Sequence, residues 1–393
     1  MQTSLVPAPS ARNTHIDLLR GVAIFCVLIL HFSLSYGIRK SPLGLLPDGV
    51  IRALALHGNY GVTMFFVVSG FLITDNAQRR WGALSRIDLR EFYVLRLSRI
   101  MPPLLPALAV IVILGSLGLP SFSNSDGGHT LPPSHFLLGA GSVLTFWHNV
   151  LMQREGYFNY CLNIYWSLSV EEMFYLLMPL LCLGLRRRSP LVLVCVAMLA
   201  IGPVYRFHHA DNEIYYMYGY LACFDAIAMG CLAAMLARVW LPAAGWARAM
   251  RWLGAAAIAA IYLRGYDGIE ALGFSIMGLA VAVFLLGAAA ATAPGALAMR
   301  LGAPLRWMGR HSYELYLYHI IVLGLMRNVL VKADLTYATR LPWLLLFLTL
   351  SSLLAALVAR HLAGPANLAL RRRLLAPRAT APLSGSRVQA EHE

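Results

Sequence analysis

Charged side chains are scarce in this sequence. Only 13% of the 393 residues are Asp, Glu, Lys or Arg, whereas 59% are hydrophobic. A soluble protein of this length carries about twice that share of charge. Apolar runs of about 20 residues recur along the chain instead, and this is the length that crosses the hydrocarbon core of a bilayer. The composition therefore excludes an ordinary soluble protein and predicts an all-α, polytopic membrane protein.

Cysteine motifs and a secretory signal are also missing. None of the six cysteines forms a CxxC pair, and all but Cys161 lie in apolar runs, where a thiol behaves as a small hydrophobic group. We therefore expect no disulfide framework and no metal site. The first apolar run contains Arg20 and has no small-residue cleavage site after it, so we expect it to remain in the protein as a first span.

About ten spans are predicted from the apolar runs. They cover residues 16–36, 55–75, 100–119, 164–184, 189–205, 215–238, 250–263, 270–290, 312–331 and 341–362. The net charge of +14 arises largely from arginine clusters in alternate loops between these spans. Because Lys and Arg collect in cytoplasmic loops, we expect both termini in the cytoplasm and do not interpret the charge as a nucleic-acid-binding surface.

Three regions follow from this pattern. Residues 1–15 form a short cytoplasmic segment, residues 16–362 a transmembrane domain, and residues 363–393 a basic, disordered cytoplasmic tail. Residues 88–99 are amphipathic and basic, and we expect them to lie along the cytoplasmic surface. Residues 135–152 are apolar, but a full crossing there would move every later basic cluster outside. We therefore interpret this segment as re-entrant or interfacial, with an eleven-span arrangement as the alternative.

The first span carries three ionisable residues, Asp17, Arg20 and His31. Such groups are costly inside a membrane, so they suggest a functional site. Arg20 and His31 are eleven positions apart, which puts both on one helix face, ~16 Å apart along its axis. Asp17 lies one turn before Arg20 and could pair with it. The alternative is structural: Asp17 caps the helix, Arg20 extends to the headgroups, and His31 makes an ordinary hydrogen bond to a neighbouring helix.

The fourth span contains two adjacent glutamates in the segment YWSLSVEEMFY. Successive helical residues diverge by about 100°, so Glu171 and Glu172 face different partners. Ser167, Glu171 and Tyr175 share one face, which favours Glu171 for the site and leaves Glu172 a structural hydrogen bond. With this span running inward, Glu171 lies near the depth of His31. A carboxylate beside a histidine orients the ring and stabilises its protonated form.

Three further segments contain polar residues. Ser69 is followed by a glycine in FFVVSGFLIT, a pattern that favours close helix packing over a serine nucleophile, because no GxSxG elbow surrounds it. Arg96 and Arg99 lie one turn apart and could clamp phosphates, although by themselves they indicate no more than a cytoplasmic face. Tyr313 and His319 in SYELYLYH are assigned a lining or supporting role.

Taken in order, these residues resemble the acyltransferase-3 family of integral membrane acyltransferases. The likeness extends over about residues 12–362, with Arg20 ten residues before His31, followed by FFVVSGFLI, RLSRIMP, WSLSVEEMFY and SYELYLYH. The resemblance implies transfer of an acyl group, usually acetyl from cytoplasmic acetyl-CoA, to a hydroxyl. Acceptors in this family are commonly sugars of surface polysaccharide, lipopolysaccharide or Nod-type glycolipid, and sometimes antibiotics. The family's arginine–histidine motif maps onto Arg20 and His31, and its basic pair onto Arg96 and Arg99.

These observations predict a role for each polar residue. His31 is the general base on the acceptor hydroxyl or, alternatively, a covalent acyl carrier, and Glu171 orients it. Arg20, Arg96 and Arg99 bind the phosphates of CoA. Eight further residues are expected to line or support the site: Asp17, Ser69, Trp166, Ser167, Glu172, Tyr175, Tyr313 and His319.

The predicted partners are acetyl-CoA or another acyl-CoA as co-substrate, a glycan or other hydroxyl acceptor, and the lipid bilayer. No tightly bound cofactor and no nucleic acid are expected, and the expected location is a bacterial cytoplasmic (inner) membrane. One alternative function is a transporter or exporter of glycans or small molecules that uses the intramembrane His, Glu and Arg as a proton or substrate path. The absence of an internal repeat argues against it. Another alternative is a non-enzymatic partner of a polysaccharide assembly complex.

Overall fold

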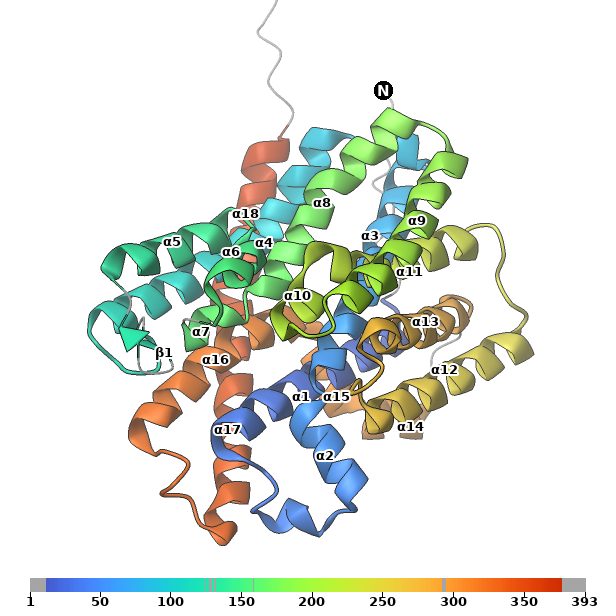
Figure 1. Cartoon of the computed structure of the whole chain (residues 1–393). Helices are drawn as coiled ribbons and strands as arrows, with labels where there is room; N and C mark the ends of the chain where they lie inside the picture. Colours follow the sequence, from blue (N-terminus) through green and yellow to red (C-terminus); the bar gives the residue numbers. More distant parts are fainter. Residues whose placement is uncertain are drawn as a thin grey trace, which may run out of the picture.

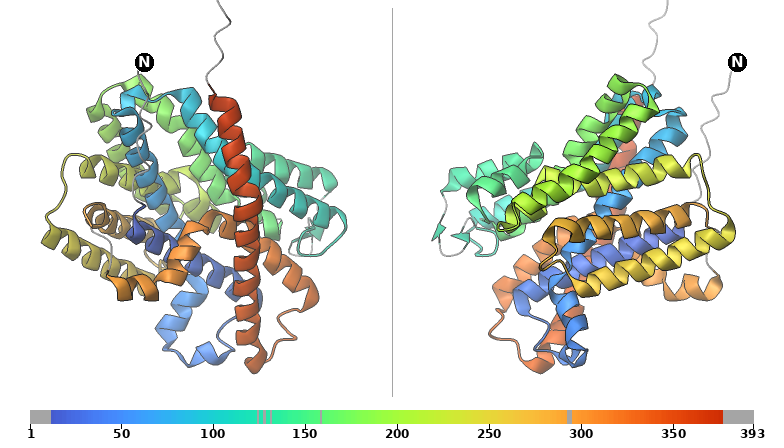
Figure 2. Two further views of the ribbon diagram at one scale, coloured as in Figure 1. Left: turned by 180° about the vertical axis from the view of Figure 1, so that it is seen from behind. Right: turned by 45° about the vertical axis from the view of Figure 1, so that its right-hand side comes forward.

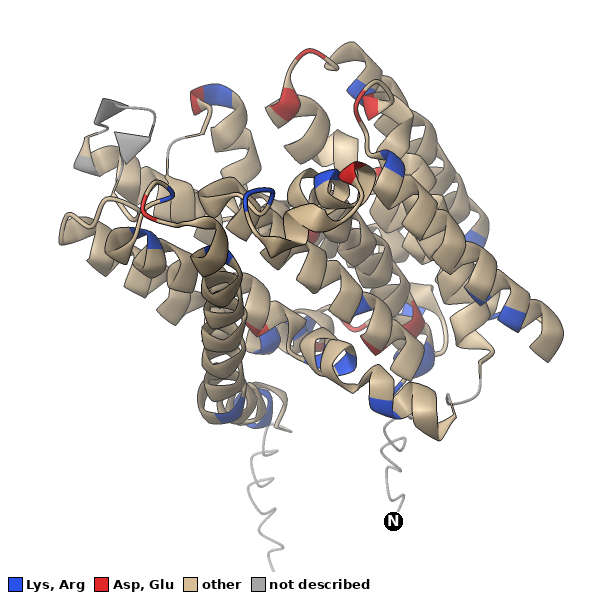
Figure 3. Ribbon diagram, turned by 90° about the horizontal axis from the view of Figure 1, so that it is seen from below, with Lys and Arg blue, Asp and Glu red and all other residues tan. Residues whose placement is uncertain are grey.

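The computed structural model describes residues 12–123, 125–126, 129–130, 132–157, 159–291 and 295–376. These residues form a bundle of helices with one short ladder, in which β1 (Ser125–Asp126) pairs with β2 (His129–Thr130) in antiparallel register. Figure 1 shows that helices make up nearly the whole molecule, and in Figure 3 most of the ribbon is neither acidic nor basic. The all-α prediction is confirmed.

All ten predicted spans coincide with long helices. These are α1 (Thr14–Tyr36), α3 (Asn59–Trp81), α4 (Leu89–Ser116), α8 (Trp166–Leu185), α9 (Arg188–His208), α11 (Tyr220–Ala237), α12 (Ala244–Arg264), α13 (Glu270–Ala289), α16 (Ser312–Val329) and α17 (Tyr337–Val358). Within the described part of the chain, eight helices are long and apolar enough to cross a membrane. Helices α12 and α16 fall outside these eight, so the total of ten spans stays a prediction.

Shorter helices connect the long ones. They are η1 (Pro42–Leu45), α2 (Asp48–Leu56), η2 (Leu84–Arg86), α5 (Pro133–Leu144), α6 (His148–Glu155), α7 (Tyr160–Asn163), α10 (Glu213–Tyr218), α14 (Ala296–Leu301) and α15 (Ala303–Arg310). The segment 135–152 is divided between α5 and α6. The 12 residues of α5 extend only ~18 Å, which is too short for a hydrocarbon core of ~30 Å. This segment is therefore not an eleventh spanning helix.

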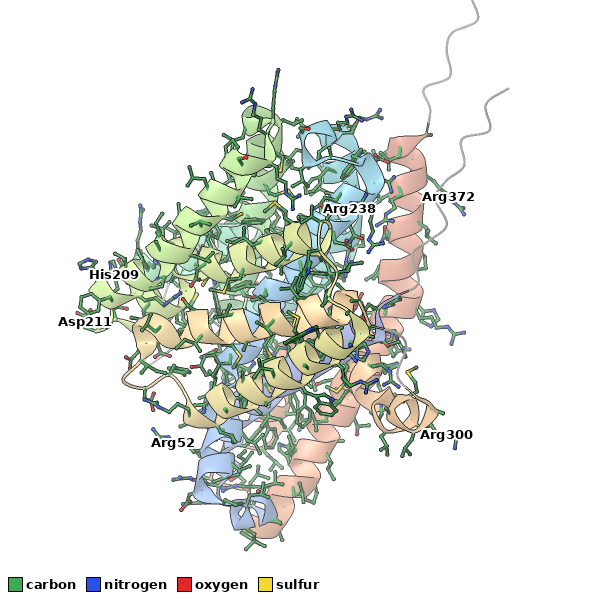
Figure 4. The ribbon with its side chains drawn as sticks, turned by 90° about the vertical axis from the view of Figure 1, so that its right-hand side faces the viewer. Arg52, His209, Asp211, Arg238, Arg300 and Arg372 are labelled. Atoms are coloured by element: carbon green, nitrogen blue, oxygen red, sulfur yellow. The ribbon has the colours of Figure 1, made fainter. Side chains whose placement is uncertain are left out.

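The loops group by side as the charge pattern predicts. Figure 4 places three arginines of the expected cytoplasmic loops and tail toward the right of the molecule: Arg238, Arg300 and Arg372. The labelled residues of the expected outer loops lie toward the left: Arg52, His209 and Asp211. Alternate loops thus share a side of the bundle.

The predicted disorder of the tail is wrong for its first part. Helix α17 continues through the π-turn η3 (Ala359–Ala363) into α18 (Gly364–Leu375), and Figure 2 shows the resulting long rod. Helix α18 packs on α4, where Arg90 donates to the carbonyl of Leu374 at 2.7 Å. The predicted surface segment 88–99 is continuous with the third span in α4. Tertiary contact therefore orders a stretch that lacks a hydrophobic pattern, and residues 377–393 lie outside the described residues.

Helices α3 and α11 pack backbone to backbone. A Cβ added at Gly70 would overlap the carbonyl oxygen of Ile227, and one added at Gly230 would overlap the carbonyl oxygen of Val67. Small residues allow this close approach between membrane helices. The predicted role of Ser69-Gly70 in close helix packing is therefore confirmed for Gly70, which lies against the backbone of α11.

A buried ion pair connects α9, α11 and α13. Arg206 is fully buried and donates to Asp225 at 2.7 and 3.2 Å, while the hydroxyl of Ser275 bonds both partners. The carbonyl of Ala271 accepts a further bond at 2.9 Å. Arg206 can be part of the core because Asp225 on the neighbouring helix compensates its charge.

Candidate functional site

A cavity of about 830 Å³ lies between α1, α3, α4, α8, α16 and α18. It brings together nine of the predicted site residues: Arg20, Ser69, Arg96, Arg99, Ser167, Glu171, Glu172, Tyr175 and Tyr313. Four predicted residues do not line it: Asp17, His31, Trp166 and His319. Among the residues that the structure describes, no group of three or more His, Cys, Asp or Glu is placed to hold a metal ion.

At the start of α1, Arg20 and Asp17 have separate partners. Arg20 donates to the hydroxyl of Ser312 on α16 at 2.7 Å, whereas Asp17 accepts from Arg12 at 2.8 and 2.9 Å. The helix cap is Asn13, whose side chain accepts from the first-turn backbone. The expected Asp17–Arg20 pair and the alternative cap at Asp17 are therefore both wrong. Arg12 neutralises Asp17 instead, and the side chain of Arg20 lines the cavity.

Glu171 forms a hydrogen-bonded cluster on the cavity wall. Its carboxylate accepts from Ser69 at 2.5 Å and from Tyr175 one turn further along α8. The guanidinium of Arg96 lies 3.9 Å from the centre of the Tyr175 ring, a cation–π contact. The predicted shared face of Ser167, Glu171 and Tyr175 is confirmed, since all three line the same cavity.

Six arginines line this cavity: Arg20, Arg79, Arg80, Arg96, Arg99 and Arg371. Two of them form ion pairs, Arg79 with Asp75 and Arg80 with Glu91. Within the described ranges, no carboxylate lies within ion-pair distance of the other four. The cavity therefore has an excess of positive charge, and guanidinium groups suit phosphate.

His31 lies against His319 of α16. Nδ1 of His31 and Nε2 of His319 are 3.0 Å apart, and the ring centres are 5.0 Å apart. The expected contact of His31 with Glu171 is wrong, because Glu171 bonds Ser69 and Tyr175 near the arginines. Helix α16 packs beside α1, and its His319 is the hydrogen-bond partner of His31 in place of the expected carboxylate.

The hydrogen bonds of this pair determine its tautomers. Nδ1 of His319 lies 3.0 Å from the carbonyl oxygen of Leu315, which can only accept, so this nitrogen carries a proton. In a neutral ring Nε2 of His319 is then an acceptor, and the shared hydrogen belongs to Nδ1 of His31. Neutral His31 consequently has its lone pair on Nε2, free to accept a proton.

Tyr316 lies between the cavity and the histidine pair. Its hydroxyl is 2.6 Å from that of Ser167 and donates to the carbonyl of Ile164 at 2.7 Å. Tyr316 lines the cavity, and its ring centre is 5.9 Å from that of His319. One aromatic ring therefore separates the arginine-rich space from the histidines.

The family described as an acyltransferase domain, acyltransferase-3, matches residues 13–361. This chain belongs to the acyltransferase-3 family. It is 26% identical over 315 residues to the O-acetyltransferase OatA of Staphylococcus aureus (strain NCTC 8325 / PS 47), covering 72% of this chain and 49% of that relative. It is 25% identical over 339 residues to the peptidoglycan O-acetyltransferase OatA of Listeria monocytogenes (serovar 1/2a), covering 80% and 50%. The chain spans about half the length of these relatives, and no solved structure matches it.

Several polar residues of this acyltransferase-3 site were not among the predicted site residues, and three of them are Ser312, Tyr316 and Arg371. Ser312 bonds Arg20, Tyr316 faces His319, and Arg371 reaches the cavity from α18. The first two lie in the quoted segment SYELYLYH, so their type and place could have been noticed. Arg371 gave no signal, because only the packing of α18 on α4 brings it there. Trp166 packs on Tyr218 behind the cavity, with ring centres 4.5 Å apart.

Proposed function

We propose that this integral membrane protein is an O-acetyltransferase. It moves an acetyl group from acetyl-CoA to a hydroxyl of a surface glycan at a bacterial cytoplasmic membrane. The observation that carries this proposal is an arginine-rich cavity next to a histidine pair with a free imidazole lone pair, in a chain of the acyltransferase-3 family. Two relatives carry O-acetyltransferase in their names, and one is named for peptidoglycan.

The arginines support an acyl-CoA donor. CoA carries three phosphates at one end and the thioester at the other, so its site needs cations at the mouth and a narrow apolar path inward. Arg96 and Arg99 lie one turn apart on α4, Arg371 adds a cation from α18, and Arg20 lies deeper on α1. A volume of about 830 Å³ suits a ligand of this size.

The histidine pair supports general-base chemistry. Nε2 of His31 takes the proton of the acceptor hydroxyl while the oxygen attacks the thioester carbonyl. The new C–O bond forms, the C–S bond breaks, and CoA leaves as a thiolate that takes the proton back from His31. Nε2 of His319 accepts from Nδ1–H of His31 throughout and stabilises the charged ring. A positioned base of this kind contributes about 10²- to 10⁴-fold in rate.

Glu171 receives a different role from the one first expected. It bonds Ser69 and Tyr175, and Arg96 lies on the Tyr175 ring. We propose that it orders the arginine wall on which the donor binds. A histidine that is hydrogen-bonded to a second histidine needs no carboxylate to fix its tautomer.

The test uses purified full-length protein in nanodiscs with acetyl-labelled CoA and a panel of glycans, with release of CoA measured by mass spectrometry. We expect His31→Ala to lose at least about a hundredfold in turnover. The matched control is His208→Ala, because His208 is exposed at the end of α9. Turnover of His31→Ala at the level of this control would refute the proposal, as would absence of CoA release by the unaltered protein with every acceptor.

A further inference from the structure

A second cavity of about 1260 Å³ lies at the other end of α1. The end of α1, the loop that follows it, α2, and the loop before α17 form its walls; Figure 1 shows these segments together at the bottom of the view. We call it the basic vestibule, because five cations line it: Arg39, Lys40, Arg52, Lys332 and Arg340. No Asp or Glu is among the described residues that line it.

One of these cations is structural. Arg340 is buried and donates to the backbone carbonyls of Lys40 at 3.3 Å, Lys332 at 3.3 Å and Leu335 at 3.1 Å. It thereby fixes the two lysine-bearing loops side by side. The buried Arg340 guanidinium therefore holds the backbones of Lys40 and Lys332 in a fixed relative position.

The two lysines are the cations that remain available. Arg52 pairs with Asp267 at 2.5 Å, and Arg39 lies 3.9 Å from Asp48. Lys40 and Lys332 are exposed, and within the described chain no carboxylate lies within ion-pair distance of either. The nearby Asp334 accepts from the backbone of its own turn.

Lysine is otherwise absent from this protein. The sequence has two lysines against 30 arginines, and both lysines line the basic vestibule. An ammonium on a flexible stem attracts carboxylates and phosphates without the fixed geometry of a guanidinium fork. Exposed charges around a cleft also steer ligands of opposite charge toward it.

The basic vestibule lies close to the proposed base. Ser33 lines it, two residues beyond His31 on α1, and Gly37 lies six residues, ~9 Å, further along the axis than His31. Arg20 faces the arginine-lined cavity at the opposite end of the same helix. Along the axis of α1, His31 therefore stands between the two basic cavities, and it lines neither of them.

We propose that the basic vestibule is the entrance for the acceptor and selects glycans that carry negative charge, as carboxylate or phosphate groups. This inference rests on the proposed function, because an acceptor entrance presupposes transfer at His31. Lys40 and Lys332 hold the anionic groups of the glycan, and Arg340 keeps the two lysines in register.

The lysines themselves provide the test. Purified full-length protein in nanodiscs of neutral lipid is treated with an amine-reactive acetylating ester, and modification of Lys40 and Lys332 is followed by mass spectrometry. The probes are a uronic-acid tetrasaccharide, a phosphorylated tetrasaccharide and a neutral hexose tetrasaccharide. We expect one or both acidic probes to slow modification about threefold or more, the neutral probe to leave it unchanged, and 0.5 M salt to remove the protection.

Equal modification with and without the acidic probes would overturn the inference, as would equal protection by the neutral probe. Protection by nanodiscs containing phosphatidylglycerol, with none from either tetrasaccharide, would assign the vestibule to lipid headgroups and overturn it too. Because this readout needs no acetyl transfer, it can fail or succeed independently of the CoA-release assay. Failure of that assay alone would refute the proposed function.

A variant adds a second measurement. The double change Lys40→Gln and Lys332→Gln should weaken binding of the protecting tetrasaccharide about tenfold, as expected from loss of two charge pairs. The control is Arg264→Gln, since Arg264 donates to the backbone of its own turn at 3.0 Å and does not line the vestibule. Equal affinity of the double variant and the control would contradict the inference.

Discussion

Replacing His319 with leucine removes the acceptor for Nδ1–H of His31 while keeping an apolar side chain of similar size. The two nitrogens are 3.0 Å apart, and the ring of His31 becomes charged when it takes a proton. Hydrogen bonds to charged groups contribute about 1.5–3 kcal/mol. If this bond is made in the transition state, its loss lowers kcat by about 10- to 150-fold. KM for acetyl-CoA should stay unchanged, because His319 does not line the arginine cavity.

His319→Gln separates a positioning role from a packing role. The amide oxygen of glutamine can stand where Nε2 stands and accept from His31, so this variant should recover a large part of kcat. Acetyl-CoA-dependent transfer is measured at saturating and limiting donor, with the melting temperature of each variant as a check on folding. The reasoning is refuted if His319→Leu keeps normal kcat, or if the glutamine variant is as slow as the leucine variant while both remain folded.

Three further changes have defined expectations. Arg96→Ala with Arg99→Ala should raise KM for acetyl-CoA at least about tenfold with little change in kcat, because two phosphate contacts are lost. Glu171→Gln should retain the contact with Ser69 and alter kcat less than about threefold. A much larger fall in kcat would show that His31 depends on the Glu171 carboxylate. Arg206→Met should lower the free energy of unfolding by about 3–5 kcal/mol, since Asp225 is left charged and buried.

Two of these changes have a matched control. Arg79→Ala tests the double arginine variant, because Arg79 lines the same cavity but pairs with Asp75. An equal rise in KM for both variants would mean that Arg96 and Arg99 act only through their general positive charge and do not bind the phosphates of CoA specifically. For Arg206→Met, thermal unfolding is compared with the double variant that also carries Asp225→Leu. Recovery of stability in the double variant is expected, and equal loss in both would contradict the ion-pair argument.

Sequence reasoning identified nine of the residues that line the cavity, and several of them share a helix face. The four-residue spacing of Ser167, Glu171 and Tyr175 is a property of the α-helix itself, and all three line one cavity. Partners on other helices were harder. The ring partner of His31 is 288 positions away, and nothing local to either histidine indicates that α1 and α16 adjoin at this depth.

The sequence by itself determined the membrane class, the positions of the long helices and the alternation of basic loops, because hydropathy and loop charge are local properties. Only the tertiary structure decided how the polar groups pair. It joined Asp17 to Arg12, Glu171 to Ser69, and His31 to His319. It also gathered the two lysines at one vestibule. Helix formation depends on backbone hydrogen bonds within one segment, whereas these pairings depend on which helices pack together.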